Sequence, residues 1–285
     1  MTFDQYIGVI DEAGVLAECG PMRLVIRSWN HGQPQIALTL RAAKEAFGCL
    51  ERIARCRPLL SRPWPQIENM PADELARRMI SSVKAIGDDD LTPMAAVAGT
   101  IADAAADWLF ERDASKVIVD NGGDIAVRLA AAETAAVGIR PKINSLDISH
   151  VINLDDCRSS WGVTTSGIGG RSFTRGIASA VTVIAGNASI ADAAATAVAN
   201  ACFVEDSHIV QVHAEQIDPN TDLKGVNVTA KVGILSREKK VQAVQAASAK
   251  ASSLCRKQLI IGALIVLEDV LLMTKGMEEF ISPSN

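Results

Sequence analysis

The apolar positions in the first third of the chain change their spacing along the sequence. Residues 6–27 combine short β-branched runs with Gly and Pro, which predicts two or three antiparallel strands. In residues 37–56 the apolar side chains recur close to the helical period, which predicts a helix. Residues 58–71 contain several prolines and are expected to form a loop, and a second helix at residues 73–86 is expected to end at Gly87.

Helical and strand patterns alternate through the middle of the chain. Thr92 and Pro93 form a good helix start, because Thr can cap free amides and Pro is pre-set for the first helical position. The Ala- and Gly-rich helix that follows is expected to reach about Leu109. Two β-rich runs then surround the Asn-Gly-Gly sequence at 121–123, which predicts a hairpin.

Residues 161–204 are the most informative part of the sequence. They predict a strand, a Gly-rich loop, a second strand (ASAVTVIA), a tight turn and an amphipathic helix. Further on, a helix is expected from Arg237 to about Lys257. The two apolar runs after it are separated by Glu-Asp, which favours a hairpin of buried strands over one continuous helix, although periodicity alone permits both.

Composition narrows the class of protein. The chain has 285 residues, of which 48% are hydrophobic and 21% charged, enough for a large continuous core. A formal net charge of -5 without a long basic run excludes tight nucleic-acid binding. The most apolar stretch, residues 259–273, is interrupted by Glu268 and Asp269 and is shorter than a membrane span. The N-terminus lacks the pattern of a signal peptide, so we expect a cytoplasmic protein that does not enter the membrane.

The six cysteines show neither a CxxC pair nor the spacing of a zinc site, which predicts reduced thiols. Cys49, Cys56 and Cys202 lie in apolar helical patterns and are expected to be at least partly buried. Cys157 lies closest to the Gly-rich loop, and whether it is reactive stays open.

Asp192 and Thr196 are four residues apart in a predicted helix, so their oxygens can converge on one hard cation. A Gly-Asn turn places the start of that helix, with its free amides, beside the same point, which suits a phosphate. The alternative is structural, because Ser189 and Asp192 also have the spacing of a capping box. Spacing alone favours this capping interpretation.

Two glycine-rich segments could approach an anion. One contains Thr165, Ser166, Gly167 and Arg171, which supply hydroxyl groups, a small residue and a positive charge. The other is the turn with Asn121, Gly122, Gly123 and Asp124. Both segments could equally be ordinary turns, with Asp124 a solvated residue at the end of a strand.

The order of these motifs is more specific than any one of them. This order resembles the ApbE family of FAD:protein FMN transferases: NGGD between two strands, then TTSG, then VTVIA, then ADxxxT. Three longer segments resemble an uncharacterised, thiamine-biosynthesis-like side branch of that family, namely LTPMAAVAG (91–99), TSGIGGRSFTRG (165–176) and ADAAATAVAN (191–200). The resemblance implies that Asp192 and Thr196 bind Mg²⁺ at the FAD pyrophosphate. It also implies that the NGGD turn and the TSG segment contact the ligand.

One element of the transferases has no counterpart. Their His-x-x-Asp-Pro segment lies between the TSG motif and the VTV strand, whereas GGRSFTRGIASA joins the two directly in this chain. His150 precedes the TSG motif and is in the wrong order to replace it. The resemblance therefore implies the fold and the metal-binding helix without flavin transfer.

We expect one α+β domain over residues 1–285, ApbE-like and T-fold-like, in which mixed or antiparallel sheets pack against helices. The best match covers residues 90–235, and a C-terminal helix plus hairpin covers 237–275. Because many strands are apolar on both faces, we also expect a homodimer.

The expected function is binding of a small phosphorylated ligand, a flavin nucleotide (FAD or FMN), with Mg²⁺, and the sequence leaves open whether the protein is an enzyme. A non-catalytic scaffold or partner subunit is the second hypothesis. A third follows from the resemblance alone: some archaeal relatives of this branch are linked to sulfur incorporation during homocysteine formation, for which Cys157 would be the thiol to examine.

Overall fold

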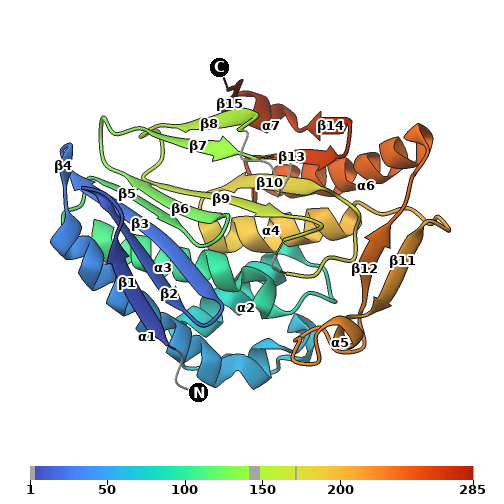
Figure 1. The fold of residues 1–285 in the computed structure, drawn as a ribbon, viewed down its shortest axis with the longest axis horizontal. Helices are drawn as coiled ribbons and strands as arrows, with labels where there is room; N and C mark the ends of the chain where they lie inside the picture. Colours follow the sequence, from blue (N-terminus) through green and yellow to red (C-terminus); the bar gives the residue numbers. More distant parts are fainter. Residues whose placement is uncertain (1–3, 141–147, 171, 285) are drawn as a thin grey trace.

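A large antiparallel sheet forms the centre of the computed structural model, which describes residues 4–140, 148–170 and 172–284. Its strands run in the order β1-β2-β3-β5-β6-β9-β10-β13-β14, with the short β4 beside β3 (Figure 1). The bounds are β1 (Gln5–Val9), β2 (Gly14–Cys19), β3 (Met22–Asn30), β4 (Gln33–Pro34), β5 (Lys116–Asp120), β6 (Asp124–Leu129), β9 (Ser160–Ser166), β10 (Ala180–Ala185), β13 (Gly262–Leu267) and β14 (Val270–Met273).

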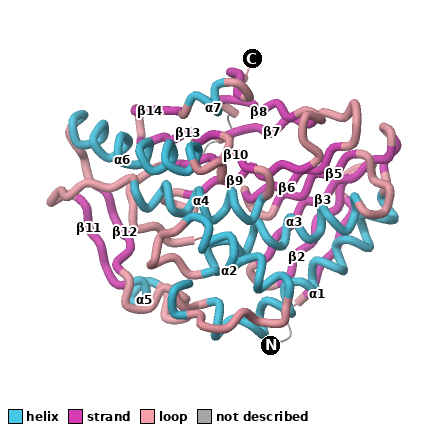
Figure 2. Tube along the Cα trace, turned by 180° about the vertical axis from the view of Figure 1, so that it is seen from behind, coloured by secondary structure: helices cyan, strands magenta, loops and turns pink. Residues whose placement is uncertain are grey.

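Helices cover one face of this sheet, as the view from behind shows (Figure 2). They are α1 (Ile36–Leu60), α2 (Glu74–Ile86), α3 (Val97–Phe110), α4 (Ala188–Ala201) and α6 (Arg237–Arg256), with the short 3-10 helices η1 (Trp64–Gln66) and η2 (Pro93–Ala96) between them. Over the described residues, no helix combines the length and the apolar character that crossing a membrane requires.

A small sheet covers half of the opposite face. It consists of β7 (Ala135–Ile139), β8 (His150–Leu154) and β15 (Ile281–Pro283), next to α7 (Lys275–Glu278). Its side chains form a second hydrophobic core with Trp161, Val163, Ile184 and Leu264 of the large sheet. Every residue of β10 and β13 is therefore buried, and the chain itself covers both of their faces. These two strands therefore offer no uncovered apolar face to a second copy of the chain, and the expected homodimer stays a prediction.

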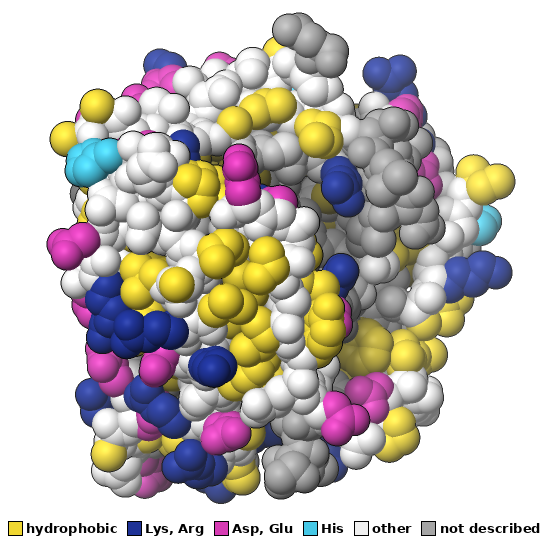
Figure 3. Space-filling view, turned by 60° about the vertical axis from the view of Figure 1, so that its left-hand side comes forward, with side chains coloured by type: hydrophobic (Ala, Val, Ile, Leu, Met, Phe, Trp, Pro, Cys, Tyr) yellow, Lys and Arg dark blue, Asp and Glu magenta, His cyan; other side chains and the backbone are white. Residues whose placement is uncertain are grey.

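The other half of that face, formed by the N-terminal strands, is not covered by the small sheet (Figure 1). Figure 3 turns this side of the molecule forward and shows hydrophobic side chains gathered beside Lys and Arg side chains. Tyr6, Val9 and Ile10, on and directly after the edge strand β1, are among the exposed large hydrophobic residues.

Several local predictions are confirmed. The N-terminal region forms three antiparallel strands, and the predicted hairpins are β5–β6 and β13–β14. Helix α2 is capped by Asp73, whose side chain accepts hydrogen bonds from the first-turn amides, and ends at Gly87 with φ +80°. The loop expected from residue 58 begins later, because helix α1 runs through Pro58 to Leu60. A proline in the last turn removes only one backbone hydrogen bond from a helix that is about to end.

The predicted helix start at Thr92 is wrong in one respect. Thr92 makes no side-chain cap, and the turn after it is the 3-10 helix η2, so that α3 begins only at Val97. The Thr92 hydroxyl instead donates a hydrogen bond to Asp222 Oδ2 at 3.1 Å. A partner 130 residues away in sequence has thus replaced the local amides.

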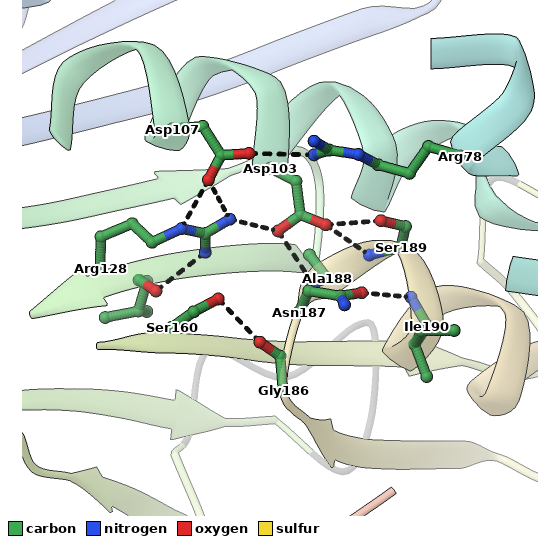
Figure 4. Close-up of polar contacts among 11 residues, drawn as sticks. Arg78, Asp103, Asp107, Arg128, Ser160, Gly186, Asn187, Ala188, Ser189 and Ile190 are labelled. Carbon is green, nitrogen blue, oxygen red and sulfur yellow. Dashed lines mark hydrogen bonds and ion pairs between the residues drawn. The ribbon is translucent and has the colours of Figure 1, made fainter. Parts of the chain in front are cut away.

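A buried carboxylate, Asp103, joins α3 to the start of α4 (Figure 4). Asp103 is 0% exposed and accepts hydrogen bonds from the amides of Ala188 (3.0 Å) and Ser189 (2.8 Å), and from the Ser189 hydroxyl (2.6 Å). Asn187 accepts from the Ile190 amide at 2.9 Å. The expectation that free amides at this helix start await a phosphate is therefore wrong, because the protein's own carboxylate already occupies them.

Arg128 of β6 balances the charge of Asp103. Its guanidinium is 2.9 Å from Asp103 Oδ1 and 2.7 Å from Asp107 Oδ1, and its side chain is only 6% exposed. Asp107 also pairs with Arg78 of α2 at 3.0 Å, closer to the surface. Two acidic and two basic side chains thus form a charged row from the surface into the layer between sheet and helices (Figure 4).

We predict that Asp103→Ala lowers the free energy of unfolding by about 3–5 kcal/mol, because it leaves the buried Arg128 charge partly uncompensated and the α4 amides without acceptors. Asp103→Asn keeps one acceptor oxygen and should cost less. Denaturant unfolding of both variants measures this. A loss below about 1 kcal/mol for Asp103→Ala, the range of an exposed pair, would contradict a structural role for this carboxylate.

Candidate functional site

Two neighbouring cavities form a cleft beside α4. The first, of about 340 Å³, lies where the turns after β2, β5 and β9 meet α3, and we call it the strand lobe. We call the second cavity, of about 280 Å³, the arm lobe. It lies under residues 209–232, which we call the arm. The lobes share the wall residues Val97, Ala98, Asp124, Ser172, Asp192 and Thr196.

The structure brings most of the predicted site residues together in the strand lobe. Its lining includes Asn121, Gly122, Asp124, Thr165, Ser166, Gly167, Asp192 and Thr196. Gly123 does not line it and serves the hairpin turn, with φ +106° and its amide bonded to Asp120 at 2.7 Å. Arg171 lies outside the described residues.

The TSG motif is the end of a strand, where the sequence predicted a loop. Thr165 and Ser166 belong to β9, and the Thr165 hydroxyl bonds that of Thr182 on β10 at 2.9 Å. At Gly167 a Cβ would lie 2.6 Å from the Ser179 carbonyl oxygen, so only glycine allows this approach of the two segments. The motif therefore has a fixed position at the edge of the strand lobe.

Asp192 does not cap its own helix. Asn187 is the N-cap of α4, and the Ser189 hydroxyl is bonded to Asp103, so the capping-box interpretation is wrong. Asp192 Oδ2 instead accepts a hydrogen bond at 2.9 Å from the amide of Gly99, in the first turn of α3. Helix α3 has no side-chain cap from its own N-cap residue, and Asp192 supplies one from the neighbouring helix.

The two helices thus cap each other. Asp103 of α3 binds the first amides of α4, and Asp192 of α4 binds a first-turn amide of α3. They touch at Gly99, where a Cβ would lie 2.2 Å from the Ala188 carbonyl oxygen. This contact fixes the position of Asp192 at the wall between the lobes.

The environment of Asp192 disfavours its negative charge. Burial raises the pKa of this carboxyl group to about 7; the amides of Gly99 and Ala98 act in the opposite direction, and the charge of Asp103 adds to the rise. A cation bound beside Asp192 would compensate the charge.

Thr196 lies one helical turn after Asp192 and lines both lobes, so the pair offers one anionic and one neutral oxygen. In the part of the chain that the structure describes, no group of three or more His, Cys, Asp or Glu side chains is placed to hold a metal ion. This donor set suits Mg²⁺, which commonly takes one or two carboxylates and completes its shell with water and phosphate oxygens.

Apart from the shared wall residues, the polar residues of the arm lobe were not among the predicted site residues. Asn200 follows Thr196 by one more turn of α4, and its Oδ1 accepts from the Thr174 hydroxyl (3.1 Å) and the Arg175 amide (2.9 Å). The Arg175 side chain pairs with Asp90 across the lobe. The four-residue spacing from Asp192 to Thr196 continues to Asn200, and this was a signal available in the sequence.

The thiols lie apart from the site chemistry. Cys202 is buried and Cys49 and Cys56 are half-buried, which confirms their expected burial. Cys157 is exposed before the start of β9, at the opposite end of that strand from Ser166. A hydrogen bond with the Asp155 side chain raises the pKa of the Cys157 thiol, which lowers its thiolate fraction at neutral pH.

Two archaeal relatives match part of the chain. A UPF0280 protein of Archaeoglobus fulgidus is 40% identical over 127 residues, which are 45% of this chain and 50% of the relative. A UPF0280 protein of Methanosarcina barkeri is 36% identical over 168 residues, 56% of this chain and 64% of the relative. The chain thus spans less than two thirds of the length of either relative.

The fold matches a solved structure over almost its whole length. The apo form of the flavinyl transferase ApbE from Pseudomonas stutzeri superimposes with a TM-score of 0.51 at 13% identity, over 98% of each chain. The expected α+β class, with antiparallel sheets packed on helices, is confirmed. The family profile described as AbpE bacteria matches residues 10–277, and the chain therefore belongs to that ApbE-like family.

Proposed function

We propose that the cleft binds a phosphorylated ligand, a flavin nucleotide such as FAD or FMN, together with Mg²⁺ held by Asp192 and Thr196. The observation that carries the proposal is the position of Asp192: its carboxylate lies in the wall shared by both lobes, in surroundings that raise its pKa. A divalent ion there would neutralise the carboxylate and the phosphates of the ligand at the same time.

The strand lobe suits a flat, largely apolar ring. Met22, Leu50 and Ile101 form an apolar part of its lining, and Asn121 and Ser166 contribute polar groups. Ligand sites commonly combine such an apolar wall with a few polar groups that fix orientation. The relative from Pseudomonas stutzeri is a flavinyl transferase by name, which supports a flavin as the ring.

The charges of the arm lobe support a requirement for the metal. Asp90, Asp218 and Asp222 line it in addition to Asp192, and the Arg175 side chain is engaged by Asp90. A phosphate without a cation would meet net negative charge at this wall. We therefore infer that ligand binding is weak without a divalent ion.

Binding without flavin transfer fits the residues that line the cleft. The described residues that line the two lobes include no His, and the histidine-containing segment of the transferases has no counterpart in them. His150 lies in the small sheet on β8, where Nδ1 is 2.9 Å from the Ser149 hydroxyl. A non-catalytic partner subunit that retains the fold as a scaffold is the second candidate.

Calorimetric titration with FAD, FMN and ATP, each with and without Mg²⁺, tests the proposed site. We expect the wild type to bind a flavin nucleotide only with Mg²⁺, and Asp192→Ala to lose this binding because the anionic metal ligand is gone. Asp206→Ala, which removes a carboxylate outside both lobes, should bind like the wild type. If the wild type binds none of the nucleotides, the scaffold hypothesis replaces this proposal.

A pH dependence follows from the raised pKa of Asp192. Since its native pKa (about 7) lies above the ordinary value of 3.8, the native state holds an extra proton between these values, and the free energy of unfolding falls as the pH rises through this range. Asn at this position stays neutral. Without metal, Asp192→Asn should therefore melt at a higher temperature than the wild type at pH 8, with the difference fading towards pH 4.

Asp11→Asn is the control of opposite sign, because hydrogen bonds from the Arg27 side chain and a backbone amide lower the pKa of Asp11. It should gain no stability at pH 8. A wild type that melts above Asp192→Asn at pH 8 in the presence of a chelator would show that the carboxylate is stable there without a cation, contrary to the proposal.

We also predict no transfer of FMN from FAD to an acceptor peptide, because the histidine-containing segment of the transferases has no counterpart. The measurement is in-gel flavin fluorescence of the peptide after incubation with FAD and Mg²⁺. A fluorescent, covalently modified peptide would make this prediction wrong, even if nucleotide binding is as proposed.

A further inference from the structure

The arm meets the main hydrophobic core through Ile209 and Val232, which are both partly buried. It consists of β11 (Ile209–His213), α5 (Ala214–Ile217), the loop 218–226 and β12 (Asn227–Val232), and its strands pair only with each other, as a separate sheet at the side of the molecule (Figure 1). Most of its side chains are exposed or half-buried. Few apolar contacts therefore hold it, which is typical of segments that open locally.

The root of the arm is fixed to the body of the protein. The Thr229 amide donates to the Thr174 carbonyl at 2.9 Å, and the side chains of Gln211 and Thr229 both donate to the Arg175 carbonyl, at 2.8 and 3.0 Å. Residues 174–175 are in turn bound by Asn200 of α4. These bonds hold the root while leaving the far end of the arm to other contacts.

The tip of the arm, residues 218–226, forms one wall of the arm lobe. Hydrogen bonds join it to the opposite side: Thr92 Oγ1 donates to Asp222 Oδ2 at 3.1 Å, and Arg57 Nη2 donates to the Asn220 carbonyl at 2.6 Å. All four residues line the arm lobe, so the two bonds join η2 and α1 to the tip along its wall. Opening the arm lobe on this side requires breaking them.

We propose that the arm is a hinged lid over the arm lobe, with residues 174–175 at its hinge and the Thr92–Asp222 hydrogen bond as its latch. The lid opens as a unit to admit a ligand and closes when the latch forms. Its role in ligand entry rests on the proposed function, whereas the motion itself can be measured on the protein without any nucleotide.

Hydrogen exchange followed by mass spectrometry tests the motion. In the wild type, the amides of residues 209–232 should exchange faster than those of α3 and α4. Thr92→Val removes the latch donor and should speed exchange of the arm at least about tenfold, as expected for one lost hydrogen bond to a charged acceptor. The matched control is Asp218→Asn, since this carboxylate lines the same lobe but bonds the Asn220 amide within the arm.

A thiol inside the lobe tests the gating. Ala95 lines the arm lobe from η2, so a cysteine in Ala95→Cys should react slowly with a bulky maleimide in the latched protein and at least about tenfold faster when Thr92→Val is added. Peptide mapping separates it from exposed Cys157. Equal labelling rates, or arm exchange as slow as that of α3 in every variant, would overturn the lid. Failure of nucleotide binding with these rates as expected would overturn only the proposed function.

Discussion

The buried carboxylate of Asp103 is the interaction on which the arrangement of the site depends. An ionised carboxylate in the layer between a sheet and its helices is tolerated only with a cation and with hydrogen bonds to its oxygens. Arg128 from the sheet supplies the cation, and the first amides and Ser189 of α4 supply the hydrogen bonds. One side chain thereby ties three elements from distant parts of the sequence.

The position of Asp192 follows from this constraint. With the start of α4 held by Asp103, the second turn of α4 lies against the start of α3, and Asp192 meets the Gly99 amide. The contact at Gly99 excludes any larger side chain. Asp192 thus caps a neighbouring helix and also lines the cleft, so its structural role is compatible with the metal-binding role proposed for it.

The sequence predicted what short spacings encode. The spacing of one helical turn predicted that Asp192 and Thr196 share a face of a helix, and the turn residues predicted the hairpin at 121–123. Both features depend on local backbone geometry. The bonds from Asp103 to the α4 amides, from Thr92 to Asp222 and from Gly99 to Asp192 could not be predicted, since each joins residues more than 80 positions apart and depends on the complete topology. A weaker signal existed: Asp103 and Arg128 are each a charged residue in an otherwise apolar run, which is typical of a buried pair.

The separation of Asp103 from the α4 amides also has a consequence for synthesis of the chain. Ala188 follows Asp103 by 85 residues, so at about 5–20 residues per second the ribosome delivers the acceptor about 4–17 s before its donors. Arg128 emerges much earlier, within the same interval. The nascent α3 helix can therefore pack on the β5–β6 hairpin with Asp103 and Arg128 already paired, and α4 docks afterwards onto a surface that has already formed.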